Sequence, residues 1–300
     1  GGGSGSAFGL MPKAYTERVG EDGYRKQPIN TGPFKMIEHI SDTRVTLEAV
    51  PNHYRKTPEY EKLVILKVPE TSTRLAMLLT GQIAITNITP TSASLVEKNA
   101  KTRVLRQPGN NVNYFMGGLI NKFKWQADRN PDGKMTNEPS AYDPKIPWVG
   151  EDFLAPDKVK VRYAMDIAID RQAIADSLYL GYAVPISEFQ SWTYGRDTPG
   201  ALWYKRWPVR PYDPQKAKQL LAEAGYPNGF NMNAWVFELP ANPLNDDVMV
   251  AIANFWEKNL NLKVTLKYGQ FTPTVRQYMI TRTLGDYAFA FTIGGPSSPQ

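Results

Sequence analysis

The last third of the chain alternates strand-like and helix-like segments, and this alternation constrains the fold more than any other feature. Strand patterns at 231–237, 262–267 and 287–293 are separated by helical patterns at 244–259 and 273–280. A strand, a helix and a second strand of one sheet usually form a right-handed crossover between parallel strands. We therefore expect an α/β fold in which helices flank a largely parallel sheet.

The first hundred residues indicate a second α/β segment with mixed strand pairing. Alternating apolar residues predict strands at 34–40, 44–48, 63–68 and 83–85. Ser41 and Asp42 form the turn between the first two strands. Thr71 or Ser72 is expected to cap a helix that ends at Gly81.

Three aspartates mark expected helix starts in the second half of the chain. Asp157 and Asp170 each precede a helical apolar pattern. Asp213 is followed by Pro214, which combines a capping residue with proline at the first helical position. The chain is expected to be strand-like from about 104 to 120, including Val112–Met116, before a long polar insert at 126–157.

The composition excludes several classes of function. The chain has no cysteine and only two histidines, His39 and His53, so disulfides, thiolate nucleophiles and iron–sulfur clusters are ruled out. No nucleophile elbow, P-loop or dinucleotide-binding motif is present. The net charge of +6 is spread over basic residues that occur at most in pairs, unlike the patch of a nucleic-acid-binding protein.

Two further segments, residues 1–7 and 128–132, have recognisable compositions or motifs. Residues 1–7 have the glycine- and serine-rich composition of an engineered flexible linker. Asp128, Asn130 and Asp132 resemble the start of a calcium-binding loop, but Pro139 stands where the loop needs a bidentate glutamate. The same residues also fit an ordinary turn. We therefore predict no metal and no cofactor, and leave calcium open.

Aromatic residues are frequent in loops and at strand ends. Trp235 and Phe237 share one face of a predicted strand and could line a cleft, as could Trp192 in a predicted loop. Packing within the core or between lobes is the alternative for most aromatic side chains.

Several segments together resemble the solute-binding proteins of peptide- and nickel-type ABC importers, family 5, which include periplasmic oligopeptide and dipeptide receptors. The resemblance rests on Asn30–Lys35, Pro51–Tyr54, Thr73–Ile83, Val161–Arg171 and Tyr212–Phe230. These segments follow one another in the family's order, and the resemblance spans nearly everything from Phe8 to Gln300.

This resemblance implies an α/β, two-lobed periplasmic-binding-protein-like fold of type II, cluster C. Residues 8–113 would form part of the first lobe and 114–300 most of the second. Such a receptor closes on a small ligand at a hinge and presents it to an ABC permease. It would be a periplasmic or lipid-anchored cell-surface protein, a monomer and not an enzyme.

The chain departs from the family in length. Family members are considerably longer, and their opening and closing segments are missing here. Since those segments normally complete the sheet of the first lobe, this chain is expected to leave strand edges unpaired. It resembles a fragment or a rearranged chain.

A second departure concerns the ligand. The family's peptide receptors pair the peptide ammonium with an aspartate, but Gly295 stands at that position and no carboxylate occurs over 287–300. An unpaired buried ammonium is unfavourable, which favours an oligosaccharide or another neutral polar ligand. An oligopeptide is the alternative within the family. The predicted ligand-binding residues are Asn113, Tyr114, Phe115, Trp192, Trp235, Phe237, Thr292, Gly295 and Ser297.

Two hypotheses from other classes stay open. A glycoside or peptide hydrolase would need an acid/base pair, for which Glu238 beside Phe237 is the one candidate near the predicted cleft. A structural or chaperone-like fragment would expose apolar surface and bind dyes without stabilisation by a ligand.

Overall fold

The computed structural model describes residues 12–105, 111–118, 143–152, 154–186, 208–239, 242–280 and 284–293. The chain divides into two compact units, residues 1–87 and 88–300. The predicted linker at 1–7 lies outside the described residues. The lobe boundary expected at 113/114 refers to a longer protein and stays a prediction.

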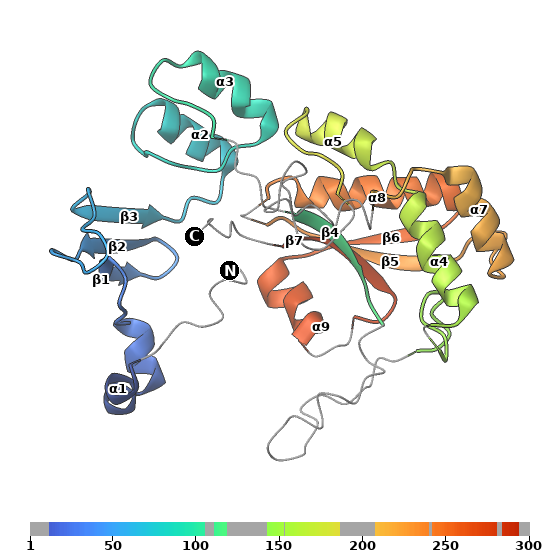
Figure 1. Ribbon diagram of the computed structural model, residues 1–300, viewed down its shortest axis with the longest axis horizontal. Helices are drawn as coiled ribbons and strands as arrows, with labels where there is room; N and C mark the ends of the chain where they lie inside the picture. The colour runs from blue at the N-terminus through green and yellow to red at the C-terminus, as the bar shows by residue number, and fades with distance from the viewer. Residues whose placement is uncertain are drawn as a thin grey trace. The chain divides into compact units, whose positions relative to one another are not determined.

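The first unit contains a helix followed by a three-stranded antiparallel meander and a second helix (Figure 1). Its elements are α1 (Lys13–Lys26), β1 (Phe34–Ile40), β2 (Arg44–Ala49), β3 (Lys62–Leu66) and α2 (Thr71–Leu79). The order in the sheet is β1-β2-β3. The predicted strands at 34–40, 44–48 and 63–68 are thus confirmed within a few residues.

Two local predictions in this unit are wrong. Residues 83–85 form no strand, because they pair with neither edge of the described sheet β1-β2-β3. Thr71 and Ser72 lie inside α2, whose cap is Glu70 without a side-chain hydrogen bond. Instead, Thr71 Oγ1 accepts a hydrogen bond from Arg74 Nη2 at 2.9 Å.

One face of the meander is mostly apolar and the other carries its ion pairs together with Val64 and Leu66, because paired residues of neighbouring strands point the same way. On the polar face, ion pairs join Lys35 to Glu48 at 2.7 Å and Arg44 to Glu38 at 2.9 Å. The apolar face includes the register pairs Val45–Ile65 and Leu47–Leu63. Leu63 is 43% and Ile65 53% exposed. Within the described residues, β1 and β3 are edges and Leu63 and Ile65 on the apolar face are exposed.

The second unit is built on a four-stranded sheet with the order β4-β7-β5-β6. Its elements are η2 (Pro90–Ser92), α3 (Ala93–Lys98), β4 (Asn111–Met116), α4 (Pro156–Ile167), α5 (Arg171–Tyr179), α7 (Pro214–Glu223), β5 (Asn231–Val236), α8 (Asn245–Leu260), β6 (Lys263–Tyr268), the π-helical turn η6 (Phe271–Val275), α9 (Arg276–Ile280) and β7 (Tyr287–Ile293).

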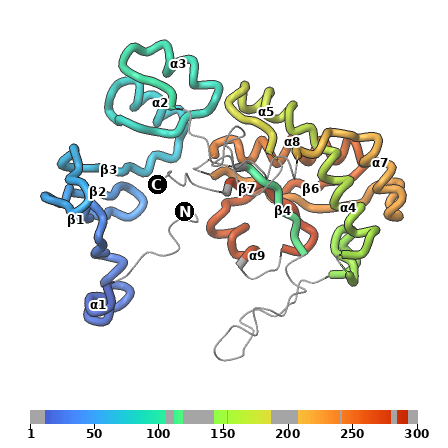
Figure 2. Tube along the Cα trace, viewed as in Figure 1, coloured from blue at the N-terminus to red at the C-terminus, as the bar shows by residue number. Residues whose placement is uncertain are grey.

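Strand β5 is parallel to both β6 and β7, whereas β4 is antiparallel to β7. The parallel crossovers predicted for residues 231–293 are therefore confirmed. Figure 2 shows β4 beside β7, although the two strands are far apart in the sequence.

Helices cover the sheet from both sides, and residue alternation on β5 assigns each face. Ala234 and Val236 join a core with α4, α7 and α8, in which Trp256 is fully buried. Trp235 and Phe237 point to the opposite face. Figure 1 shows α8 and α9 on opposite sides of the sheet.

Two of the three predicted aspartate caps are confirmed. The carboxylate of Asp170 accepts a hydrogen bond from Ala173 N at 2.9 Å, and that of Asp213 from Lys216 N at 2.8 Å. The Asp157 prediction is wrong, because α4 begins at Pro156 and Asp157 lies inside its first turn. Proline at the first helical position moved the start one residue earlier.

No helix within the described ranges is both long enough and apolar enough to cross a bilayer.

Candidate ligand site at the carboxyl edge of the second sheet

The two central parallel strands separate at their carboxyl ends, and Asn245 joins them there. Pairing of β5 with β7 ends at Trp235–Phe289. Asn245, the first residue of α8, is 1% exposed. Its Nδ2 donates to the carbonyl oxygens of Phe237 at 3.0 Å and Ala290 at 3.1 Å. The amide thus bridges β5 and β7 where their own hydrogen bonds end.

Five buried side-chain atoms of the described residues make no hydrogen bond: Asn113 Nδ2, Trp235 Nε1, Asn245 Oδ1, Asp246 Oδ1 and Thr292 Oγ1. Asn113 pairs in register with Phe291, and Val112 pairs with Thr292. The start of β4 therefore lies beside the end of β7. Buried polar atoms are rarely left without partners. Because open α/β sheets bind ligands outside the carboxyl ends of their strands, we take this edge as the candidate site.

The sheet separates the predicted site residues into two sets. Asn113 and Phe115 lie on the face of the aromatic cluster described below, as their register partners Phe291 and Phe289 show. Thr292 alternates with Ala290, which belongs to the core formed with α4, α7 and α8. Asn113 and Thr292 therefore meet at one end of the sheet but on opposite sides of it.

An aromatic cluster covers the face that carries Phe115. Phe115 stacks on Phe289 with ring centroids 5.3 Å apart, and Phe271 meets Phe237 at 5.3 Å and Phe291 at 4.9 Å. Phe237 is only 3% exposed. Phe237 thus packs within the second unit, while Phe115 and Phe291 are partly exposed at the margin of the cluster.

Trp235 lies in the same cluster but is enclosed by other rings. It stacks on Tyr278 and on Tyr287, with centroid distances of 5.7 and 5.4 Å. Its exposure is 9%, and its Nε1 is buried without an acceptor. In this state the indole offers little ring surface to a ligand.

Tyr114 points away from Asn113 and Phe115, into the core formed with α8. Its ring meets the edge of Trp256 with centroids 5.6 Å apart, and its hydroxyl donates to Asp166 Oδ1 at 3.1 Å. Burial, followed by the nearby charge of Asp166, raises the pKa of Tyr114. Tyr114 therefore shares the face of Thr292 and is separated from Asn113 and Phe115.

Asp166 is the centre of a charged network behind the site. Its carboxylate forms ion pairs with Arg171 and with Arg210, the latter at 2.7 Å. Arg171 Nη1 also donates to the Asp166 carbonyl oxygen at 3.0 Å. The network joins β4, α4 and α5 to the segment before α7, and so holds the helix layer against the sheet.

Several predicted residues lie outside the described part of the chain. They are Trp192, Gly295 and Ser297, together with the possible calcium ligands Asp128, Asn130 and Asp132. Glu238, the hydrolase candidate, is exposed. No group of three histidine, cysteine, aspartate or glutamate residues that could hold a metal occurs among the described positions.

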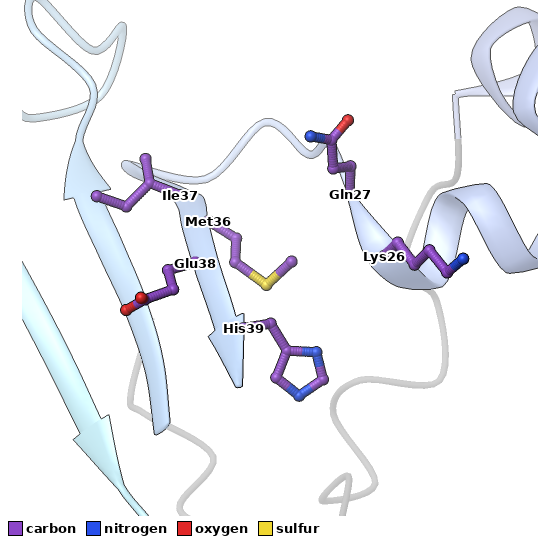
Figure 3. Close-up of a pocket in the computed structure, with 6 residues that line it drawn as sticks. All are labelled: Lys26, Gln27, Met36, Ile37, Glu38 and His39. Atoms are coloured by element: carbon purple, nitrogen blue, oxygen red, sulfur yellow. The ribbon is translucent and has the colours of Figure 1, made fainter. Parts of the chain in front are cut away.

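The first unit holds a separate pocket of about 190 Å³ between the end of α1 and β1 (Figure 3). It is lined by Lys26, Gln27, Met36, Ile37, Glu38 and His39. The Glu38 carboxylate already binds Arg44 and Thr46, and these hydrogen bonds lower its pKa. The pocket therefore offers weaker chemistry than the carboxyl edge of the second sheet.

Sequence reasoning did not identify Asn245. A usable signal existed, because Asn245 begins the helix that follows a strand of a parallel sheet. That position places a residue at the carboxyl edge, where ligands bind.

A predominantly parallel sheet with helices on both faces defines the class of α/β proteins. Within this class, the chain belongs to the bacterial extracellular solute-binding proteins of family 5. The family model described as "Bacterial extracellular solute-binding proteins, family 5 Middle" matches residues 6–300. The resemblance inferred from the sequence motifs is thus confirmed, as is the α/β periplasmic-binding-protein fold.

Individual relatives show how much of a family member's length this chain covers. The heme-binding protein A of Haemophilus influenzae is 30% identical over 214 residues, covering 70% of this chain and 32% of the relative. The dipeptide-binding protein of Escherichia coli is 24% identical over 274 residues, covering 87% of this chain and 44% of the relative. NikZ from Campylobacter jejuni, solved with Ni(L-His), has a TM-score of 0.67 at 19% identity, covering 96% of this chain and 51% of that one. The chain thus spans between 32% and 51% of the length of these proteins.

Proposed function

We propose that the protein containing this chain is a receptor that captures a small ligand by hinge closure. It acts outside the cytoplasmic membrane and delivers the ligand to the permease of an ABC importer. Membership of family 5 supports this role. The observation that carries the proposal is the buried, unpartnered Asn245 Oδ1 between β5 and β7, with Asn113 Nδ2 also buried and unpartnered at the same end of the sheet. A bound ligand would supply the missing hydrogen bonds.

A short peptide is the ligand class that the described residues favour. The sequence favoured an oligosaccharide, which commonly stacks on an aromatic face, but Trp235 is 9% exposed and stacked on two tyrosines. A peptide backbone offers carbonyl oxygens to the Asn113 amide and N–H groups to Asn245 Oδ1. The E. coli relative described as a dipeptide-binding protein supports the same class. The oligosaccharide stays the alternative prediction.

Differential scanning fluorimetry of the full-length protein tests this proposal. We expect a tripeptide library to raise the melting temperature and malto-oligosaccharides to leave it unchanged, because a ligand that binds the folded state stabilises it. A shift with oligosaccharides alone would establish the alternative. If neither panel shifts the melting temperature, the proposed ligand classes are both wrong.

The hydrolase hypothesis is tested in the same samples. Incubation with the tripeptide library should leave every peptide intact by mass spectrometry, because the proposed receptor binds and releases its ligand unchanged. Cleavage that disappears in the Glu238→Gln variant would instead support the hydrolase.

A further inference from the structure

The start of α8 presents hydrogen-bond acceptors at the candidate site. Helix α8 follows the carboxyl end of β5, and its N-cap residue, Leu244, supplies no side-chain cap. Its first turn carries Asn245, Asp246 and Asp247. Two of these residues hold buried oxygen atoms without a hydrogen-bond partner, namely Asn245 Oδ1 and Asp246 Oδ1.

The orientation of the Asn245 amide is set by its neighbours. Both atoms that it contacts, the carbonyl oxygens of Phe237 and Ala290, are acceptors, so the donor Nδ2 must face them. The other polar atom of this amide is Oδ1, which can only accept a hydrogen bond. With 1% exposure, bulk water does not reach it freely.

The adjacent carboxylates add negative charge. Burial, and then the charge of Asp246, raises the pKa of Asp247, which indicates that the two carboxylates repel each other at short range. No ion pair is formed by either of them within the described residues. Their environment therefore favours a cation or a hydrogen-bond donor over an anion.

The helix dipole does not account for this arrangement alone. Acidic residues in a first turn are stabilised by the positive end of the helix. A carboxylate oxygen that served as a cap would accept a backbone N–H, whereas Asp246 Oδ1 accepts none. The dipole explains the charge at this position but not the buried, unpartnered oxygen.

We propose that Asn245 and Asp246 form a subsite for the primary ammonium group of the ligand. This inference rests on the proposed receptor function and deepens it. The ammonium would donate to Asn245 Oδ1 and Asp246 Oδ1 and neutralise the carboxylate. The absence of a carboxylate over 287–300, which argued against ligands with a free amine, is compensated by a carboxylate from α8.

The test compares a tripeptide library that has free amino termini with the same library after N-acetylation, using isothermal titration of the full-length protein. We expect free peptides to bind and acetylated peptides to bind at least about tenfold more weakly. The Asp246→Asn substitution keeps the size of the side chain and should weaken binding of free peptides about tenfold or more. Asp176→Asn, the same charge change at an exposed position on α5, is the matched control and should change affinity less than about threefold.

The outcomes separate this subsite from the receptor function. If free and acetylated peptides bind equally, the protein is a peptide receptor but the subsite is wrong. Unchanged affinity in a folded Asp246→Asn protein leads to the same conclusion. If this variant does not fold, the comparison of free with acetylated peptides on the natural protein still tests the subsite. If no peptide binds, the peptide-receptor function and the subsite are rejected together.

Discussion

The hydroxyl of Tyr114 on β4 donates a hydrogen bond to the carboxylate of Asp166 on α4, at 3.1 Å. The same carboxylate is paired with Arg171 and Arg210. Since Asp166 is 9% exposed, this buried charge is held by three donors from separate parts of the chain. The contact fixes the helix layer against the strand that carries Asn113.

Replacing Asp166 by asparagine should destabilise the second unit. The substitution leaves Arg171 and Arg210 without their charge partner, and removing one member of a buried ion network is strongly unfavourable. Because Arg210 is partly exposed, we expect a loss of about 2 kcal/mol in the free energy of unfolding. Urea unfolding followed by tryptophan fluorescence measures this, because all seven tryptophans lie beyond residue 87.

The control for this substitution is Asp176→Asn on α5. Asp176 is exposed and accepts one hydrogen bond from Gln172, so its loss should change stability by less than about 0.5 kcal/mol. Equal stability of the Asp166→Asn and Asp176→Asn proteins would show that the Asp166 network does not support the fold.

Replacing Asn245 by alanine should destabilise the same unit through a different mechanism. The carbonyl oxygens of Phe237 and Ala290 lose their donor while they stay buried. Two lost hydrogen bonds of this kind amount to about 2–3 kcal/mol. The exposed Asn254 of the same helix, changed to alanine, is the matched control. Hydrogen exchange of the β7 amides should accelerate in the first variant only; equal exchange in both would contradict the bridge.

Tyr179 should make stability depend on pH in the alkaline range. Burial raises its pKa from 10.0 to about 12, although a hydrogen bond with Asn242 opposes the shift. Between these two values the folded state keeps the proton that the unfolded state releases, so stability decreases as the pH rises from about 10. In the Tyr179→Phe protein, this decrease should be smaller.

Urea midpoints at pH 8 and pH 11 measure the effect for the natural protein, Tyr179→Phe and Tyr268→Phe. The ring of Tyr268 is 72% exposed, so it serves as the control and should behave like the natural protein. An identical pH dependence in all three proteins would be inconsistent with the buried state of Tyr179.

The uncovered apolar face of the first unit should bind a hydrophobic dye. Leu63 and Ile65 lie on that face, and replacing both by lysine should reduce the fluorescence of bound anilinonaphthalene sulfonate. Val64 is similarly exposed but points to the opposite, polar face. A Val64→Lys protein should therefore keep most of the dye signal. If Val64→Lys reduced the dye fluorescence more than the double substitution does, the dye would bind to the face of Val64 and the prediction would be wrong.

Much of the fold could be predicted from local sequence patterns. The strand–helix alternation over 231–293 and the caps Asp170 and Asp213 depend on residues only a few positions apart. The strand expected at 83–85 failed because a strand needs a partner, which local patterns do not supply.

The candidate site was predicted in part, for related reasons. Asn113 and Thr292 were expected from strand ends and from the resemblance to the family. The role of Asn245 depends on the carbonyl oxygens of Phe237 and Ala290, 8 and 45 residues away. Tyr114 was grouped with its neighbours although strand alternation places it on the other face of the sheet.

The sequence by itself determined the family, the alternation of elements and two of the three aspartate caps, because these depend on short-range periodicity and motifs. Only the tertiary structure decided which polar atoms are buried without a partner and which carboxylate lies at the carboxyl edge. Those properties arise when strand ends, a helix start and a distant strand come together, since burial and hydrogen-bond satisfaction depend on all the groups around an atom.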